Sequence, residues 1–220
     1  MTLASTLRFI MQHPMNRQEP FSAVARFAWW QIVSRIRSEV EFEWINGSKL
    51  ITKRGMTGAT GNIYCGLHEY VDMSFLLHLL RPEDLFVDVG ANVGSYTILA
   101  SAVCGARSIS IEPDPQTAKY LSQNISANEL DRRCRVAVSA VGNDEGFISF
   151  TVGKDTTNQV RTRHYEPSQM VPLTRLDTVL RGQSPTLVKM DVEGFEMEAL
   201  SGAKTMLSRP GLKGIIIENM

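Results

Sequence analysis

The sequence predicts an α/β protein with a Rossmann-like, mostly parallel, twisted sheet and helices on both of its faces. From residue 81 onward, short apolar segments alternate with helical segments, which is typical of parallel strands joined by crossover helices. The first of these strands, 85–89, runs into a glycine turn, and the second ends on the acid Glu112. Sheets of this kind bind ligands beyond the carboxyl ends of their strands. These two strand ends therefore mark the candidate site.

The core is expected to hold five strands with helices between them. The expected strands are 85–89, 108–111, 135–141, 186–190 and 214–218. The expected helices are 95–103, 115–128 and 196–207. The polar stretch 142–170 is predicted to be irregular.

Residues 1–80 differ in character and are expected to form a helix, β-hairpin and cap region in front of the core at 81–220. Apolar side chains recur at helical spacing over 21–37 beside arginines, which predicts an amphipathic helix packed on the main domain or, as the alternative, lying on a membrane surface. Alternating residues over 39–45, the pair Asn46-Gly47 and then 49–53 predict a hairpin with a type I′ turn. A glycine-rich, polar stretch at 55–66 leads into a helix at 69–80.

Composition sets limits on the function. The 220 residues suit one α/β domain with an extra subdomain. Lysine plus arginine equals aspartate plus glutamate, 23 of each, so no overall field draws the chain to nucleic acid, and no nucleic-acid partner is expected. Three cysteines without a C-x-x-C pair favour neither a disulfide framework nor a zinc site. With no apolar run approaching the roughly 20 residues of a membrane span and no signal-peptide pattern, the expected location is the cytoplasm.

The segment from Asp88 to Gly94 is the strongest chemical signal, because glycines before a helix start bring backbone N–H groups against a ligand. Nicotinamide enzymes use G-x-G-x-x-G at this place, whereas this turn has G-x-x-x-G from Gly90, with Asp88 two residues earlier. An aspartate repels a pyrophosphate but attracts the α-ammonium group of a methionine moiety. Asn92, in the middle, tolerates a left-handed backbone. The turn therefore favours S-adenosylmethionine over NAD, the alternative being an ordinary turn that binds nothing.

Glu112 closes the second strand, 24 residues after Asp88. Doubly wound folds place an acid at this distance that accepts hydrogen bonds from ribose hydroxyls. The other interpretation is a solvated loop acid. Together with the glycine turn, the spacing favours ribose binding.

The chain contains the segments FVDVGANVGSYT, IEPDP, LTRLD and LVKMDVEGFE, the last of which runs from Leu187 to Glu196. These four segments resemble the FkbM family of methyltransferases. The resemblance covers most of the chain from Cys65 onward. It implies a class I S-adenosylmethionine-dependent enzyme that methylates a hydroxyl of a sugar, glycan or polyketide-type molecule; the alternatives are an NAD-type oxidoreductase and a non-catalytic ligand-binding domain. Carried over by position, the resemblance implies that the methionine end of the cofactor is surrounded by Asp88, Gly90, Asn92 and Gly94. It likewise implies that Glu112 binds the ribose and that Ser139 and Ala140 lie along the adenine.

Candidate catalytic residues follow the fourth strand. Asp191 is the candidate that accepts or orients the proton of a substrate hydroxyl, and Lys189, on the same face of the strand, is expected to pair with it and keep it ionised. Glu196 is expected to stabilise the start of the next helix. His68 is a second candidate base, although a lone histidine is more often a surface or core residue. Glu69 is the stronger site member there, through the methionine ammonium or the substrate.

Two further hypotheses concern the last strand. Asp191 with Glu218-Asn219 offers oxygen ligands that suit magnesium, but a glutamate at this place is more commonly a salt-bridge or pocket residue, so no metal is expected. A methyltransferase sheet, as the resemblance implies it, has seven strands, and five are counted here. C-terminal strands are therefore expected to be missing, which would leave 214–218 as an exposed edge that invites a homodimer.

Overall fold

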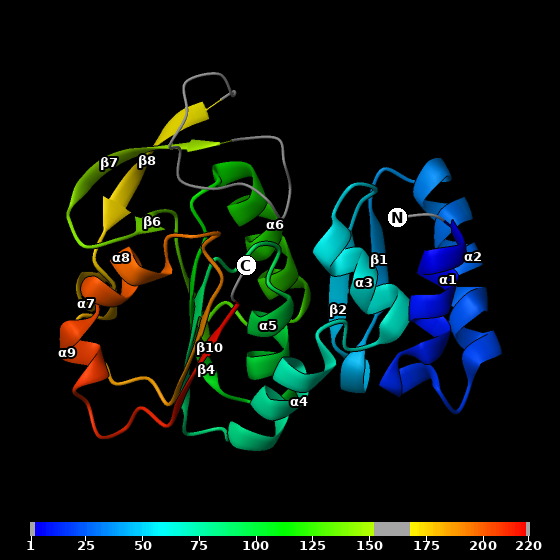
Figure 1. Cartoon of the computed structure of the whole chain (residues 1–220), viewed down its shortest axis with the longest axis horizontal. Helices are drawn as coiled ribbons and strands as arrows, with labels where there is room; N and C mark the ends of the chain where they lie inside the picture. The colour runs from blue at the N-terminus through cyan, green and yellow to red at the C-terminus, as the bar shows by residue number, and fades with distance from the viewer. Residues whose placement is uncertain (1–2, 152–167, 219–220) are drawn as a thin grey trace.

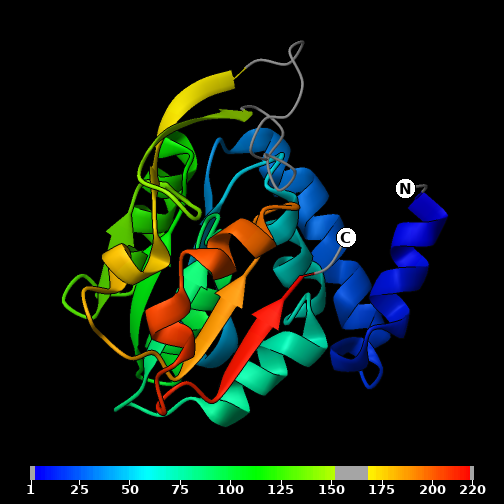
Figure 2. The same cartoon turned by 60° about the vertical axis from the view of Figure 1, so that its left-hand side comes forward.

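The computed structural model describes residues 3–151 and 168–218, except for the side chain of Thr57. Its central sheet has five parallel strands in the order β10-β9-β3-β4-β5. Their bounds are β3 Leu85–Val89, β4 Arg107–Ile111, β5 Cys134–Ala137, β9 Leu187–Met190 and β10 Gly214–Ile217. The chain goes from β3 through β4 to β5 on one side and returns to β9 and β10 on the other (Figures 1 and 2). The strand order therefore reverses between β3 and β9, where such sheets bind ligands.

Helices cover both faces of this sheet (Figure 1). One face carries α4 (Tyr70–Leu79), α5 (Ser95–Ile98) with its π-helical continuation η3 (Leu99–Val103), and α6 (Pro115–Ala127), while the other carries α7 (Leu176–Leu180), α8 (Glu196–Ser201) and α9 (Lys204–Leu207). Successive residues of β3 point to opposite faces: Phe86 packs with Leu76 and Leu121, and Val87 packs with Val188 and Leu180. The predicted Rossmann-like fold is confirmed.

A second sheet, in the order β6-β8-β7, lies beside the carboxyl ends of the strands. It consists of β6 (Ala140–Val141), β7 (Gly146–Thr151) and β8 (Ser168–Thr174). The single strand predicted at 135–141 is therefore wrong, since β5 ends at Ala137 and β6 pairs with β8 instead. The irregular region predicted at 142–170 is also wrong within the described residues. There Ile148 and Phe150 of β7 form a small core with Val171 of β8, while 152–167 lie outside the described residues.

The N-terminal elements pack side by side at the opposite end of the molecule from α7 and α9 (Figure 1). They are α1 (Leu3–Gln12), the short helix η1 (Pro14–Asn16), α2 (Pro20–Ile36), β1 (Val40–Glu43), the turn η2 (Ile45–Gly47), β2 (Lys49–Thr52) and α3 (Thr57–Cys65). The hairpin is confirmed: Asn46 and Gly47 have φ of 52° and 78°, as a type I′ turn requires, and Ser48 N donates to Ile45 O at 3.1 Å. The division of the chain at residue 80 stays a prediction, and α4 packs into the main core through Leu76.

Helix α3 forms in the stretch that the sequence described only as glycine-rich and polar. Gly61 faces the ring of His68 so closely that a Cβ would lie 2.5 Å from it. The side chain of Asn62 then accepts a hydrogen bond from His68 N at 2.9 Å. A glycine that usually weakens a helix here permits a close contact that a larger residue would prevent.

Strand β10 is an edge of the central sheet within the described residues, where it pairs with β9 alone. The hairpin β1-β2 and the sheet β6-β8-β7 are separate sheets and do not extend it. Association of two chains through this edge stays a prediction.

The helix predicted at 196–207 is two short helices, α8 and α9, separated at Gly202 and Ala203. Gly202 abuts the backbone at Gly142, and a Cβ there would lie 1.9 Å from Gly142 O. The break therefore follows from packing against the segment after β6.

We expect Gly202→Ala to destabilise the protein by about 1–3 kcal/mol, because the added methyl group overlaps a backbone oxygen that cannot rotate away. The matched control is Gly214→Ala, where the nearest atom to a Cβ is a flexible side chain at 3.5 Å. Thermal unfolding of both variants tests this expectation. Equal melting temperatures would show that the segment at Gly142 moves freely.

Candidate functional site

The turn after β3 is held against the ends of two neighbouring strands. Gly90 N and Ala91 N donate to Ile111 O of β4 at 2.9 and 3.0 Å. On the other side, a Cβ on Gly90 would lie 1.8 Å from Asp191 O, beyond β9. With a φ of 76° as well, this position accepts only glycine without strain. A valine at Gly90 would therefore disturb the fold itself, besides any ligand.

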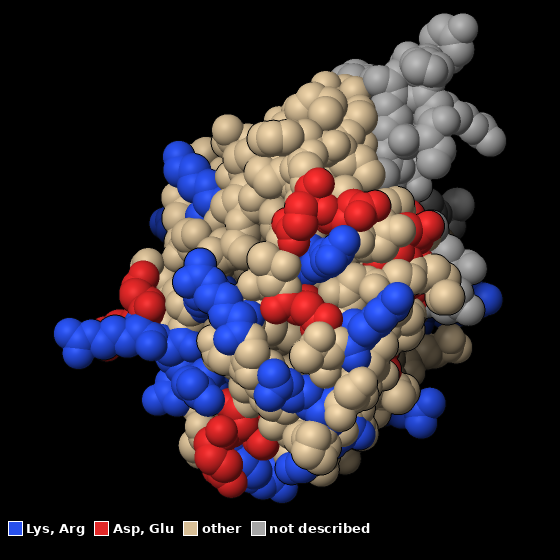
Figure 3. Space-filling view, turned by 90° about the vertical axis from the view of Figure 1, so that its left-hand side faces the viewer, with Lys and Arg blue, Asp and Glu red and all other residues tan. Residues whose placement is uncertain are grey.

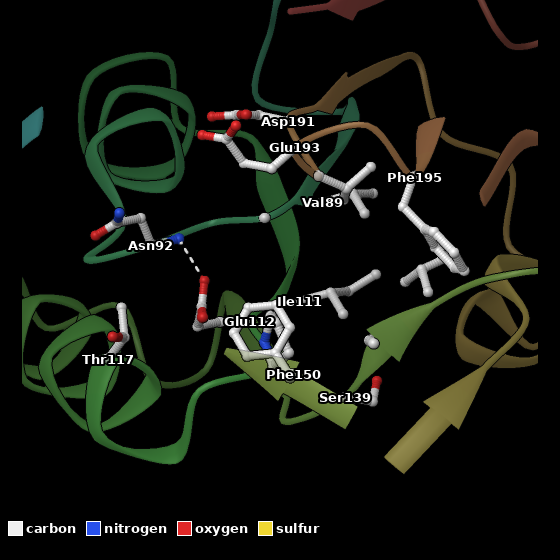
Figure 4. Close-up of a pocket in the computed structure, with 15 residues that line it drawn as sticks. Val89, Asn92, Ile111, Glu112, Thr117, Ser139, Phe150, Asp191, Glu193 and Phe195 are labelled. Atoms are coloured by element: carbon white, nitrogen blue, oxygen red, sulfur yellow. Dashed lines mark hydrogen bonds between the residues drawn. The ribbon is translucent and has the colours of Figure 1, made fainter. Parts of the chain in front are cut away.

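Asn92 and Glu112 lock the middle of the turn. Asn92 has a φ of 50°, the left-handed conformation expected from the sequence, and its Oδ1 accepts from Val93 N at 2.7 Å. Asn92 N donates to Glu112 Oε2 at 2.9 Å (Figure 4), and Asp114 N donates to Glu112 Oε1 at 3.0 Å. Burial raises the pKa of Glu112 to about 7, although both backbone donors oppose the shift. Each carboxylate oxygen keeps further acceptor capacity.

Asp88 lies deep in the sheet with one oxygen satisfied. Thr97 Oγ1 donates to Asp88 Oδ2 at 2.7 Å, and Ser110 lies 2.7 Å from the same hydroxyl. Asp88 Oδ1 is buried without a hydrogen-bond partner among the described residues. Burial raises the pKa of Asp88 to about 6, against the attraction of Lys189. An unpartnered buried acceptor of this kind is costly unless a ligand supplies the donor.

Two pockets meet at this turn. The first holds about 610 Å³ of empty space and includes Glu112, Ser139, Ala140 and Phe150 among its lining. The second holds about 440 Å³, and its lining includes the acids Glu69 and Asp88, the aromatic side chain of Tyr96 and the cation Lys189. Gly90, Asn92 and Asp191 line both pockets, so together the pockets form one cleft around the carboxyl ends of β3, β4 and β9.

The first pocket has a mixed lining (Figure 4). Phe150 of β7 and Phe195, before α8, supply aromatic surface, while Glu112 and Ser139 supply polar atoms. Ser139 Oγ is buried without a hydrogen-bond partner among the described residues. Such a lining suits a flat, partly polar ring system. Phe150 belongs to the region that the sequence left irregular, so sequence reasoning missed it.

Lys189 is the buried cation of the second pocket. Its Nζ donates to Asp191 Oδ2 at 2.9 Å, which confirms the ion pair predicted from their spacing. Burial alone would lower the pKa of Lys189, but Asp191, Asp88 and Glu69 outweigh burial and raise it. The ammonium also lies 5.0 Å from the centre of the Tyr96 ring. Lys189 therefore stays charged.

Tyr96 is a site residue that the sequence did not single out. Its hydroxyl donates to Glu69 Oε2 at 2.5 Å. Burial, followed by the charge of Glu69, raises the pKa of Tyr96, so the phenol stays protonated. Its place two residues after Gly94, on the first turn of α5, was the signal available in the sequence.

His68 lies outside both pockets. Its ring packs edge-on against Phe9 at 5.7 Å between ring centres and lies against Gly61, in the N-terminal layer. Its neighbour Glu69 points into the second pocket instead. The structure thus brings Glu69 together with Asp88 and Lys189, but does not bring His68 to them.

The remaining acids divide by position. Glu196 Oε1 accepts from Gly194 N at 3.0 Å, just before α8, which fits the helix-start role predicted for it. Glu193 lines the first pocket, and burial raises its pKa. Burial, with help from Asp191, raises the pKa of Glu218 to about 7. Over the ranges 3–151 and 168–218 no cluster of three or more side chains suits a metal ion, and Asn219 lies outside those ranges.

A sequence model of the methyltransferase FkbM domain matches residues 88–220, more than half of the chain. The chain belongs to the FkbM family of methyltransferases. Its cofactor is S-adenosylmethionine, and the acid before the glycine turn fits that cofactor rather than NAD. The oxidoreductase alternative is therefore not favoured.

Two curated proteins are similar to this FkbM chain. Hexuronic acid methyltransferase AglP of Haloferax volcanii is 29% identical over 136 residues, which cover 60% of this chain and 55% of that protein. The tRNA(Phe) (4-demethylwyosine(37)-C(7)) aminocarboxypropyltransferase of Pyrococcus horikoshii is 22% identical over 157 residues, which cover 63% and 54%. The chain thus spans about half the length of the curated relatives it matches.

Solved structures with limited likeness include two methyltransferases. A SAM-dependent methyltransferase from Agrobacterium tumefaciens has a TM-score of 0.49 at 9% identity, covering 82% of this chain and 52% of that one. An rRNA methylase from Streptococcus thermophilus has a TM-score of 0.45 at 15% identity, covering 69% and 72%.

The buried carboxyls of this FkbM chain should make the ligand-free protein less stable as pH rises. The folded pKa of Asp88 is about 6, above its ordinary 3.8, so its contribution to stability is full below the unfolded pKa and is lost as pH rises through the folded value. We expect Asp88→Asn to raise the melting temperature relative to wild type, more at about pH 8 than at about pH 5.

Thermal unfolding at both pH values measures this effect, with the exposed Glu83→Gln as the control. A gain that is the same at both pH values would show that Asp88 is not a strained carboxylate in the folded chain.

Proposed function

We propose that this chain transfers a methyl group from S-adenosylmethionine to a hydroxyl oxygen of a sugar, glycan or polyketide-type small molecule. One observation carries the proposal: the unpartnered carboxylate oxygen of Asp88 lies in the same pocket as the Lys189–Asp191 ion pair. A cation-binding acid and a charged acid–base pair thus flank one glycine turn.

The cleft fits the cofactor in two parts. Asp88 Oδ1 needs a donor, and the α-ammonium of the methionine part supplies one beside Gly90, Asn92 and Gly94. In the other pocket Glu112 has acceptor capacity left for two ribose hydroxyls, while Ser139 Oγ and the backbone at Ala140 offer polar contacts to an adenine edge. The cofactor brings a methyl group on a positively charged sulfur, ready for in-line transfer to a nucleophile.

The residues of the second pocket then position the acceptor. Asp191 lines both pockets, so it lies where the methyl donor and the acceptor meet. It accepts the proton of the acceptor hydroxyl, and its ion pair with Lys189 holds the carboxylate in place. The bonded pair Glu69 and Tyr96 forms a fixed wall that orients the acceptor.

The charge of this pocket favours a neutral acceptor. Three carboxylates, Glu69, Asp88 and Asp191, face one cation, Lys189, and the single positive net charge of the cofactor does not reverse that sign. An acidic acceptor would be repelled at short range. Unlike the relative named for hexuronic acid, this chain is proposed to prefer neutral sugars over uronic acids. A labelled-methyl assay in which the two classes of sugar compete as acceptors tests this preference.

We expect Glu112→Gln to weaken cofactor binding by about 1–3 kcal/mol, the range for a lost hydrogen bond to a charged group. The wild-type affinity should also fall as pH drops through about 7, where the free Glu112 takes up a proton. The variant should lose this fall and keep only the one near pH 6 that protonation of Asp88 causes. Calorimetric titration with S-adenosylmethionine across pH measures both effects. Unchanged affinity in the variant would show that Glu112 only fixes the turn through Asn92.

We expect Asp191→Asn to lower kcat by about 100-fold or more while cofactor affinity changes little, because the lost charge acts on the hydroxyl proton. Turnover with a panel of hydroxylated acceptors and titration of the cofactor separate the two effects. The surface change Asp131→Asn serves as the control. Equal losses of binding and turnover would move Asp191 into cofactor binding.

A further inference from the structure

Helix α2 presents apolar side chains on two opposite faces. Its inner face buries Ala23 and Trp30 against α1, α3 and β1. On the outer face Phe21 is 89% exposed, Ile36 77% and Ile32 61%. A helix with large apolar side chains on two opposite faces normally has both faces covered.

The exposed side chains form one continuous stripe. Phe21, Ala25, Ala28, Trp29, Ile32 and Ile36 recur at intervals of three and four residues and are all exposed, so they share one face of the helix. We call these six residues the outer stripe. At its C-terminal end, Leu3 of α1, itself 65% exposed, lines an open apolar groove with Ile32 and Ile36. The stripe therefore extends onto a second helix.

The same segment carries a positive charge that the rest of the chain does not share. Residues 1–37 hold five arginines and one glutamate, a formal charge of +4, whereas the whole chain is neutral. Arg8, Arg17, Arg35 and Arg37 are exposed. Arg35 lines the same groove as Leu3, Ile32 and Ile36. An apolar surface is thus flanked by cations.

Figure 1 shows α1 and α2 at the outer end of the molecule, away from the central sheet. Helix α3 packs between α2 and the second pocket, which it helps to line through Gly58, Ala59 and Asn62. The stripe is therefore outside the catalytic cleft, and substitutions in it leave the cleft residues in place.

We propose that α1 and the outer stripe of α2 dock on an anionic phospholipid bilayer surface. The large side chains of the stripe enter the boundary between headgroups and acyl chains, while the arginines reach lipid phosphates. No helix in the ranges 3–151 and 168–218 is long and apolar enough to cross a membrane, so the contact is peripheral. A second copy of the chain fits the same surface less well, because a symmetric pairing of the stripe would oppose the like charges of both copies.

Co-sedimentation of the full chain with vesicles tests the proposal. We expect binding to vesicles of phosphatidylcholine with phosphatidylglycerol, little binding to phosphatidylcholine alone, and a loss of binding at high salt. Phe21→Ser/Ile32→Ser/Ile36→Ser should weaken binding by at least about tenfold. Arg8→Gln and Arg35→Gln should each weaken it by about fivefold. The matched control replaces three equally exposed apolar residues elsewhere, Val71, Phe147 and Met197, by serine and should bind as wild type.

Tryptophan emission gives an independent readout. Of the three tryptophans, Trp30 and Trp44 are buried and Trp29 is 42% exposed, so a blue shift on adding anionic vesicles reports Trp29. Trp29→Phe should remove that shift but keep sedimentation. Titration of S-adenosylmethionine, unchanged in the stripe variant, shows that the variant is folded.

Three outcomes overturn the proposal: no sedimentation with anionic vesicles, equal sedimentation with neutral vesicles, or equal losses in the stripe variant and its matched control. A concentration-dependent dimer that the stripe variant abolishes, without vesicle binding, would assign the stripe to a second copy of the chain.

Discussion

The close approach of Gly90 to the carbonyl oxygen of Asp191 sets the geometry of the whole cleft. It brings the end of β3 against the end of β9 at a distance that excludes any side chain at residue 90. On its other flank the same turn is bonded to the end of β4. The two pockets are the spaces on either side of this junction. Their shape therefore depends on having glycine, which has no Cβ, at residue 90.

Strand register at that junction places the charges. Asp88 pairs in register with Ser110 on one neighbouring strand and with Lys189 on the other, and residues in register on parallel strands face the same side of the sheet. A polar row thus crosses the buried face of the sheet below α5. Burial makes it costly to keep Asp88 and Glu112 ionised. In the function that we propose, the cationic and hydroxyl groups of the cofactor offset that cost, so cofactor binding stabilises the ionised carboxylates.

The N-terminal layer, made of α1, α2 and α3, is stabilised on its inner side and exposed on its outer side. Its inner contacts depend on close approach, as at Gly61 against His68, and on apolar packing between α1, α2 and α3. Its outer surface exposes large apolar side chains, and Arg35 lines the same groove as Ile32 and Ile36. Exposed apolar side chains on the outer face of α2 do not help to cover the central sheet. We therefore propose a separate partner, an anionic bilayer surface, for this face.

What the sequence determined by itself is the part governed by local periodicity and backbone conformation. Alternation of strands and helices was enough for the central sheet, and the glycine turn with Asp88 and Glu112 was recognisable because left-handed residues and a strand-end acid leave a local pattern. Tertiary structure alone decided four features. They are the side chains of Tyr96 and Phe150 in the pockets, the helix break at Gly202 and the position of His68 outside the cleft. Three of these depend on a group a few ångströms away: the carboxylate of Glu69 at Tyr96, the backbone of Gly142 at Gly202, and Gly61 at the ring of His68. Contacts between residues far apart in the chain carry no local periodicity, so only the folded arrangement shows them.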